Sequence, residues 1–249
     1  MPGAFVNLYK PPAKHLPDPT YGTDPYDLNF VFPIKPEILE NDKLQLTPFI
    51  PALHAEGYWT EAHPTRQPGL YDYLPWSPQS LDEFLSLVER YRQDPTGVLF
   101  AILDKTRQGQ PLAGIIGVIR CDPRNLVAEI GAIIVFPAFQ RSHVASNAIG
   151  LAMRYCLDLQ TASPPGLGLR RVIWATAPEN VASNKGAQKM AMKQEVTCRW
   201  NWLLAPGKGG GRDRPGDPRP GVDMVLYAMC WDDWESAGRE AATKVMDRR

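Results

Sequence analysis

The chain has 249 residues, and its 27 Lys and Arg residues balance its 27 Asp and Glu residues. A formal net charge of zero argues against broad electrostatic capture of nucleic acid or of an anionic membrane. No apolar run is long enough to span a membrane and no secretory signal pattern is visible, so we expect a cytoplasmic protein. The four cysteines and four histidines are scattered without metal-ligand spacing, which predicts buried free thiols and no metal site.

Residues 1–40 are rich in proline and in aromatic residues. Proline at this density interrupts helices and sheet ladders, which predicts an extended N-terminal arm. The tyrosines and phenylalanines of the arm indicate that parts of it lie against a single domain formed by residues 41–249.

The first half of this domain alternates between strand and helix patterns. A strand over residues 43–50 leads into a helix over 51–63, and a second helix begins at Ser80, with Asp82 and Glu83 in its first turn. Three strand patterns follow, over residues 98–105, 111–121 and 126–136. Short turns connect them, which predicts an antiparallel meander.

The second half adds a long helix from about residue 146, a strand over 170–177 and a helix over 180–193. Residues 195–204 alternate so regularly that Val196, Cys198, Trp200 and Trp202 should share one face. Residues 205–221 are too rich in Gly and Pro for regular structure, which predicts a mobile basic hairpin loop. A strand over 222–231 and a helical tail close an α+β pattern with one mixed sheet.

The stretch between the third meander strand and the long helix is a polar turn, Gln140 to Ser146, without glycine. The first-turn N–H groups of a helix lack intrahelical acceptors and lie at the positive end of its dipole. Such an end can bind a phosphate or pyrophosphate, with Arg141 adding charge. The alternative is that Ser142 or Ser146 simply caps the helix.

The order of these elements resembles the GNAT superfamily of acyl-CoA-dependent N-acyltransferases, most closely its RimJ/RimL-type branch and fungal relatives of that branch. The stretches "PLAGIIGVI", "AEIGAIIVFPAFQRSHVASNAIGLAM", "RRVIWATAPENVASNKGAQKMAMKQE" and "MVLYAMCWDDWE" carry the resemblance in order, over about residues 43–236. It implies a mixed, mostly antiparallel sheet that is splayed between its fourth and fifth strands, with helices on both faces.

The resemblance also implies a site for acetyl-CoA in that split, with no metal. The family's fourth-strand groups that pair with pantetheine match Ile133, Ile134, Val135 and Phe136. Its asparagine beside pantetheine matches Asn180, and the serine that follows matches Ser183. Its pyrophosphate loop matches seven consecutive residues, namely Gln140, Arg141, Ser142, His143, Val144, Ala145 and Ser146.

The sequence departs from the family pattern at two places. His143 and Ala145 fill the two glycine positions of the pyrophosphate loop, and Ala191-Met192 replaces a Gly-Phe-type pair after the fourth helix. A loop without glycine can still present its amides if its φ values stay negative. His143 could contact phosphate or be an exposed turn residue. The second departure could alter the substrate or abolish donor binding.

Amine attack on a thioester needs a base for the amine and a proton for the leaving thiolate. Glu129, which matches the family's "E-I-G" glutamate, is the candidate base, and its alternative role is a structural hydrogen bond at the strand edge. Ser183 and Tyr227 are candidate acids. Ser183 could equally cap a helix, and Tyr227 could equally be a core residue.

The aromatic residues Tyr58, Trp59, Tyr71, Tyr73 and Trp76 are expected at the acceptor side, although they could equally pack the core or the arm. They favour a flat or apolar small-molecule amine, in secondary metabolism for example, bound by a monomer or homodimer. A protein N-terminus is the other acceptor considered. Two further functions stay open: CoA-independent acid–base chemistry on the same fold, and a non-catalytic binding module whose cleft is covered by the arm.

Overall fold

A computed structural model of the chain describes residues 6–10 and 15–248. Residues 1–5 and 11–14 of the predicted arm, and residue 249 of the predicted C-terminal helix, lie outside the described residues. Within the described ranges, no helix is both long enough and apolar enough to cross a membrane.

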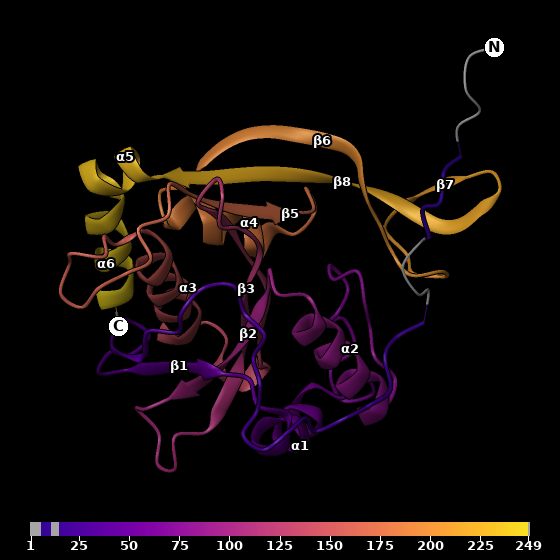
Figure 1. Cartoon of the computed structure of the whole chain (residues 1–249), viewed down its shortest axis with the longest axis horizontal. Helices are drawn as coiled ribbons and strands as arrows, with labels where there is room; N and C mark the ends of the chain where they lie inside the picture. Colours follow the sequence, from indigo (N-terminus) through magenta and orange to yellow (C-terminus); the bar gives the residue numbers. More distant parts are fainter. Residues whose placement is uncertain (1–5, 11–14, 249) are drawn as a thin grey trace.

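One mixed sheet organises the fold (Figure 1), with the strand order β1-β2-β3-β4-β5-β8-β6 and with β7 paired to β8. All its pairs are antiparallel except β4–β5, which is parallel. The predicted meander and the mostly antiparallel sheet are therefore confirmed. The strands are β1 (Leu44–Pro48), β2 (Val98–Asp104), β3 (Leu112–Asp122), β4 (Val127–Val135), β5 (Arg171–Thr176), β6 (Lys193–Leu203), β7 (Arg212–Arg214) and β8 (Asp217–Cys230).

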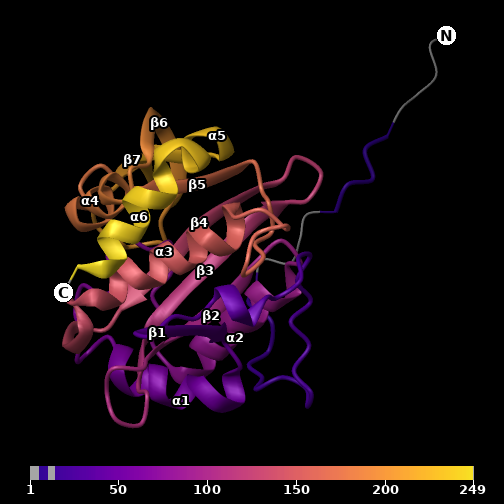
Figure 2. The same ribbon diagram turned by 90° about the vertical axis from the view of Figure 1, so that its left-hand side faces the viewer.

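Helices cover both faces of the sheet, as predicted. In Figure 1, α1 (Pro51–Ala62) and α2 (Leu81–Gln93) lie on one side of β2 and β3. In Figure 2, α3 (His143–Leu157) and α6 (Arg239–Asp247) lie together in front of the other side. The remaining helical segments are η1 (Pro36–Ile38), η2 (Pro137–Phe139), α4 (Val181–Lys189), α5 (Trp231–Asp233) and the π-helical turn η3 (Trp234–Gly238).

Local sequence explains where α2 begins. The Ser80 hydroxyl accepts a hydrogen bond from the Glu83 amide at 3.1 Å, and the Glu83 carboxylate accepts one from the Gln79 amide at 2.7 Å. This reciprocal arrangement is a capping box, shifted by one residue on its acidic side. Phe84 and Val88 then turn to the core, where Phe84 stacks on Tyr58 of α1 with ring centroids 4.1 Å apart.

The strands near the C-terminus differ from the predicted pattern. The register of β6 against β8 shifts between Cys198 and Trp202, and Trp200 has a left-handed φ of 53°. The bulge lays the Trp200 ring against Gly221, where a Cβ atom would lie only 2.2 Å from it. The prediction that residues 195–204 alternate regularly between two faces was therefore wrong. Parts of the predicted irregular loop at 205–221 are strands, since β7 and the start of β8 lie within it.

Residues 21–34 of the arm run along the edge of the domain near α1 and α2, whereas residues 6–10 extend away from it (Figure 1). Phe30, Phe32 and Ile34 pack against the core, and the Val31 amide donates to the Pro95 carbonyl at 2.9 Å. The Tyr155 hydroxyl of α3 donates to the Pro33 carbonyl at 3.0 Å. These contacts fasten residues 30–34 to both α3 and the α2–β2 connection.

Candidate functional site at the β4–β5 split

The sheet opens between β4 and β5. These strands pair only over Val127–Glu129 and Arg171–Ile173, so the rest of β4 diverges from β5. The cause is a bulge in β4: Gly131 lies opposite Gly117 but Ile134 lies opposite Ile115, which leaves one extra residue on β4. Ala132 takes up the bulge with a left-handed φ of 49°. The backbone of Ile133 to Phe136, where the resemblance places pantetheine, lies beyond this point.

The turn after β4 leads directly into α3. The Gln140 side chain folds back, and its Nε2 donates to the Val135 carbonyl at 2.9 Å. Ser142 is the N-cap of α3, because its Oγ accepts from the Val144 amide at 3.3 Å and donates to the Phe139 carbonyl at 2.6 Å. The Ser146 hydroxyl donates to the His143 carbonyl at 3.0 Å. The local capping role of Ser142 is therefore confirmed.

The two filled glycine positions need no left-handed backbone. His143 and Ala145 both lie in the first turn of α3, and the left-handed conformation falls instead on Arg141, with φ of 59°. Arg141 is exposed at the tip of the turn. A helical first turn points its amide groups out of the N-terminus whatever its side chains are, so the glycine-free turn keeps the geometry of an anion site.

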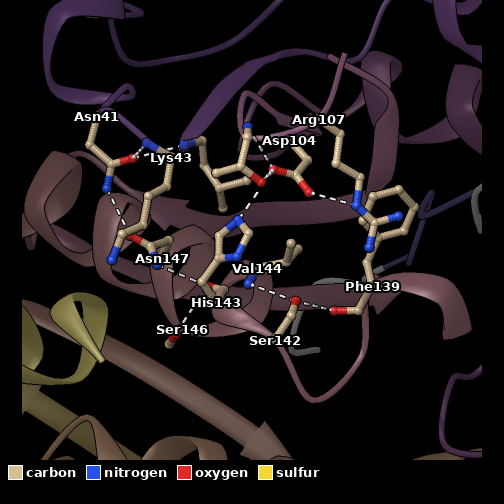
Figure 3. A network of polar contacts seen from close by, with 12 residues as sticks. Asn41, Lys43, Asp104, Arg107, Phe139, Ser142, His143, Val144, Ser146 and Asn147 are labelled. Atoms are coloured by element: carbon tan, nitrogen blue, oxygen red, sulfur yellow. Dashed lines mark hydrogen bonds and ion pairs between the residues drawn. The ribbon is translucent and has the colours of Figure 1, made fainter. Parts of the chain in front are cut away.

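His143 takes a position that neither prediction anticipated. Its side chain is largely buried, and its Nε2 lies 3.2 Å from Asp104 Oδ1 at the end of β2 (Figure 3). It therefore points into the domain, and it is not an exposed turn residue.

The start of α4 carries the next two predicted residues. Asn180 is the N-cap, and its Oδ1 accepts from the Ser183 amide at 3.1 Å. The Ser183 hydroxyl accepts from Trp174 Nε1 of β5 at 2.9 Å. Its own proton is thereby left to be donated elsewhere. Ser183 is not the cap residue of this helix.

Tyr227 lies on β8 and is buried. Its hydroxyl donates to Asn184 Oδ1 at 2.8 Å and lies 3.4 Å from Gln188 Nε2. Because the proton of Tyr227 is already donated to Asn184, its hydrogen bonds favour Ser183 over Tyr227 as the candidate acid.

Glu129 is a buried carboxylate at the last paired position of β4. Arg120 of β3 donates to Glu129 Oε2 at 2.8 Å, and the guanidinium of Arg120 also lies 4.6 Å from the ring of Trp202 on β6. Burial raises the pKa of Glu129 above its ordinary value, although Arg120 opposes part of that rise. A carboxylate with a raised pKa is suited to accept a proton near neutral pH.

Glu129 and the candidate acids lie on opposite faces of the sheet. Glu129 is paired with Ile173, so both side chains share one face, and the next residue, Trp174, points to the other. Tyr227 is paired with Trp174 and Ser183 bonds to it, so these residues lie on that other face. A group placed in the split would therefore have Glu129 on one side and Ser183 on the other.

Two of the five aromatic residues expected at the acceptor side are core residues. Tyr58 and Tyr71 are buried, and their hydroxyls lie 3.3 Å apart. Tyr73 is half exposed, and its hydroxyl donates to the Glu179 carbonyl at 3.2 Å, which links the α1–α2 connection to the β5–α4 connection. Tyr58 and Tyr71 are therefore not available to line an acceptor pocket.

Several residues of the site were missed from the sequence. These residues are Asp104, Arg120 and Trp174, whose partners lie on other elements of the fold. No local sequence motif indicates such contacts. A charged residue inside the apolar run "GIIGVIRC" was the one available signal for Arg120.

One group of described residues, Cys230, Asp232 and Asp233, has the spacing to hold a metal ion. It lies at the opposite end of β5 from α4, where Arg171 donates to Cys230 Sγ at 3.6 Å and Lys193 pairs with Asp233 at 2.5 Å. These cations compensate the charge of the group and compete with a metal for it.

The comparisons with known proteins agree with this geometry. The acetyltransferase (GNAT) domain family matches residues 43–193 of the chain. None of the curated proteins matches it in sequence. Solved structures with the same fold include a GCN5-related N-acetyltransferase from Brucella melitensis, at 22% identity and a TM-score of 0.69, with 86% of each chain covered.

Two further similar structures were solved with ligands. The spermidine N-acetyltransferase from Vibrio cholerae, in complex with CoA and spermine, is 17% identical, with a TM-score of 0.58 over 79% of this chain and all of that one (100%). The microcin C7 self-immunity acetyltransferase, in complex with acetyl-CoA and AMP, is 17% identical, with a TM-score of 0.57 over 76% of this chain and 93% of that one.

Proposed function

The chain belongs to the GNAT acetyltransferase family, and from this premise we propose that it transfers the acetyl group of acetyl-CoA to a primary amine by direct attack of the amine on the thioester. The observation that carries the proposal is the opening of the sheet between β4 and β5 beside the first turn of α3. We propose further that residues 41–249 form the catalytic domain and residues 1–40 an arm outside it.

The donor would lie in the split. The backbone groups of Ile133 to Phe136 that face the split and are not already bonded would bind the pantetheine arm. The Val135 carbonyl already accepts from Gln140 Nε2, and the Phe136 amide already donates to the Ala113 carbonyl. The α3 amides with Arg141 would bind the pyrophosphate. Asn180 and Ser183 would flank the pantetheine from α4. The family's donor chemistry requires no metal and no covalent enzyme intermediate.

The two proton transfers would take place on opposite faces of the sheet. Glu129 would take a proton from the attacking amine on one face, while Ser183 would give a proton to the leaving thiolate on the other. Tyr227 would support this side through Asn184 and Gln188. Backbone amides of the diverging β4 would stabilise the oxyanion of the tetrahedral intermediate.

The acceptor is a primary amine of a small molecule or of a protein N-terminus. The family match and the two liganded neighbours support amine acetylation in general and single out no acceptor. An aromatic or apolar acceptor, a cytoplasmic location, a role in secondary metabolism and a fungal relationship stay predictions.

An acetyl-transfer assay tests the proposal. The protein is incubated with acetyl-CoA and, in turn, polyamines, amino acids, aromatic amines and short peptides with free N-termini. Released CoA thiol and acetylated product are then measured. At least one class should be acetylated, and Glu129→Gln should lower kcat by about 10²–10⁴-fold, the usual contribution of a general base.

Glu61→Gln, at an exposed position of α1, is the matched control and should keep wild-type activity. Acetyl-CoA that stays intact with every class of amine would contradict the transferase proposal. A Glu129→Gln variant as active as wild type would contradict the role of Glu129 alone.

A further inference from the structure

The turn between β2 and β3 braces the loop that precedes α3. Arg107 in that turn donates from Nη2 to the Ala138 carbonyl at 2.9 Å, and its guanidinium lies 4.0 Å from the centre of the buried Phe139 ring. Asp104 at the end of β2 reaches His143 in the first turn of α3 (Figure 3). Two residues three positions apart therefore hold both ends of the loop.

Asp104 is itself almost fully buried, with its side chain 1% exposed. Its Oδ1 accepts from the Thr106 amide at 3.0 Å, from the Thr106 hydroxyl at 2.7 Å and meets His143 Nε2 at 3.2 Å. Its Oδ2 lies 3.4 Å from Arg107 Nε and, among the described residues, accepts no hydrogen bond. Burial alone would raise the pKa of Asp104, but the Thr106 hydrogen bonds and His143 bring it below its ordinary value.

A carboxylate buried in this way needs its partners, because an unpaired buried charge is costly. The contact therefore fixes the His143 ring, and through it the orientation of the first turn of α3. The same turn presents the amide groups that we assign to the donor's pyrophosphate. A glycine at position 143, as in the family pattern, has no side chain with which to form such a contact.

We propose that His143 is a positioning residue, which binds Asp104 and thereby holds the α3 amides in place for the donor's pyrophosphate. This inference rests on the proposed donor site. It assigns the His143 ring to Asp104 and not to the phosphate. It also gives the β2–β3 turn the role of supporting a loop that lacks glycine. The residues involved lie 39 positions apart in the chain.

Two substitutions of similar size separate the hydrogen bond from the space that the ring fills. His143→Leu fills the space but donates nothing, whereas the amide of His143→Gln can donate to Asp104 from nearly the same place as Nε2. Calorimetric titrations with CoA and with pantetheine, which lacks the pyrophosphate and the nucleotide, then give the readout.

CoA should bind about tenfold more weakly to the Leu variant than to wild type, because α3 amide groups that are displaced from the pyrophosphate bind it less well. The Gln variant should regain most of that affinity, and pantetheine should bind all variants equally. His54→Leu is the matched control, because His54 also lies in the first turn of a helix, where its Nδ1 accepts from the Ile50 amide at 2.9 Å. It should leave both affinities unchanged.

Wild-type affinity for CoA in the Leu variant would overturn the inference. Equal losses in the Leu and Gln variants, or a parallel loss of pantetheine binding, would also overturn it, because either result indicates general damage to the site. Wild-type protein that does not bind CoA would overturn the proposed function, and the inference with it.

Discussion

Burial raises the pKa of Glu129, and one neighbouring residue, Arg120, opposes that rise. Arg120 reaches Glu129 through a left-handed backbone position, with φ of 49°, at an irregularity in the β3–β4 register. The other side of its guanidinium lies on Trp202, so the side chain is held at the carboxylate although it is half exposed. Burial and Arg120 therefore act on Glu129 in opposite directions.

Arg120→Gln should move the acidic limb of the pH profile of kcat/KM to higher pH. Without the guanidinium, burial raises the pKa of Glu129 further, and the ionised base forms only at higher pH. The profile is measured with any amine that the transfer assay identifies. Arg124→Gln, in the exposed β3–β4 turn, should leave the limb in place. A limb that is unmoved or moved to lower pH in Arg120→Gln would contradict this account.

At the scale of elements, α4 ends in a left-handed turn that usually contains glycine, although alanine occupies the position here. The Met192 amide donates to the Ala187 carbonyl at 3.1 Å and the Ala191 amide to the Gln188 carbonyl at 3.0 Å, which together form a Schellman motif. Ala191 has a left-handed φ of 58°, the conformation in which glycine is favoured. The Ala191-Met192 departure therefore leaves the helix end in its usual geometry.

Ala191→Gly should raise the free energy of unfolding by about 0.5–1 kcal/mol. The left-handed conformation costs an L-residue about 1–2 kcal/mol, and the added flexibility of the unfolded chain offsets about 0.4–1 kcal/mol of that gain. Urea unfolding measures the difference. The control Ala182→Gly, in the first turn of the same helix, should lower stability by about 0.5–1 kcal/mol. Destabilisation by Ala191→Gly would contradict the assignment.

The sequence predicts elements best where their signals are local. The Ser80 start of α2, the Ser142 cap of α3 and the three-strand meander all depend on residues a few positions apart, and all are confirmed. Trp200 broke the predicted alternation because its ring packs on Gly221, which is distant in sequence. The contacts of His143 and Glu129 could not be predicted from the sequence either, because their partners lie on strands that are distant in the chain or carry no local motif.

At the scale of the whole molecule, the two halves of the sheet are tied together on the face that carries Glu129. Tyr73 bonds to the Glu179 carbonyl, and Lys208 donates to the carbonyls of Tyr71 and Leu74. Arg120 and Trp202 form a third link, from β3 to β6. These links hold the α1–α2 connection against the C-terminal half while β4 and β5 diverge behind it.

The described part of the arm takes no part in these links between the two halves of the sheet. Its described hydrogen bonds to the rest of the chain involve Gln45 and Leu46, Glu56, Arg92 and Gln93, Pro95, Lys105, Tyr155 and Gly166. Among the described residues, none of them reaches the diverging part of β4 or the first turn of α3. This distribution disfavours a binding module whose cleft is covered by the arm.

The central claim is that one donor site joins β4, the first turn of α3 and the start of α4. Hydrogen–deuterium exchange with and without CoA tests it most directly, because it reports on every segment at once. We predict slower exchange in peptides that cover residues 132–146 and 180–184, and unchanged exchange in peptides from the arm, residues 26–34. Protection confined to the arm, or no protection at 132–146 while CoA is bound, would contradict the claim.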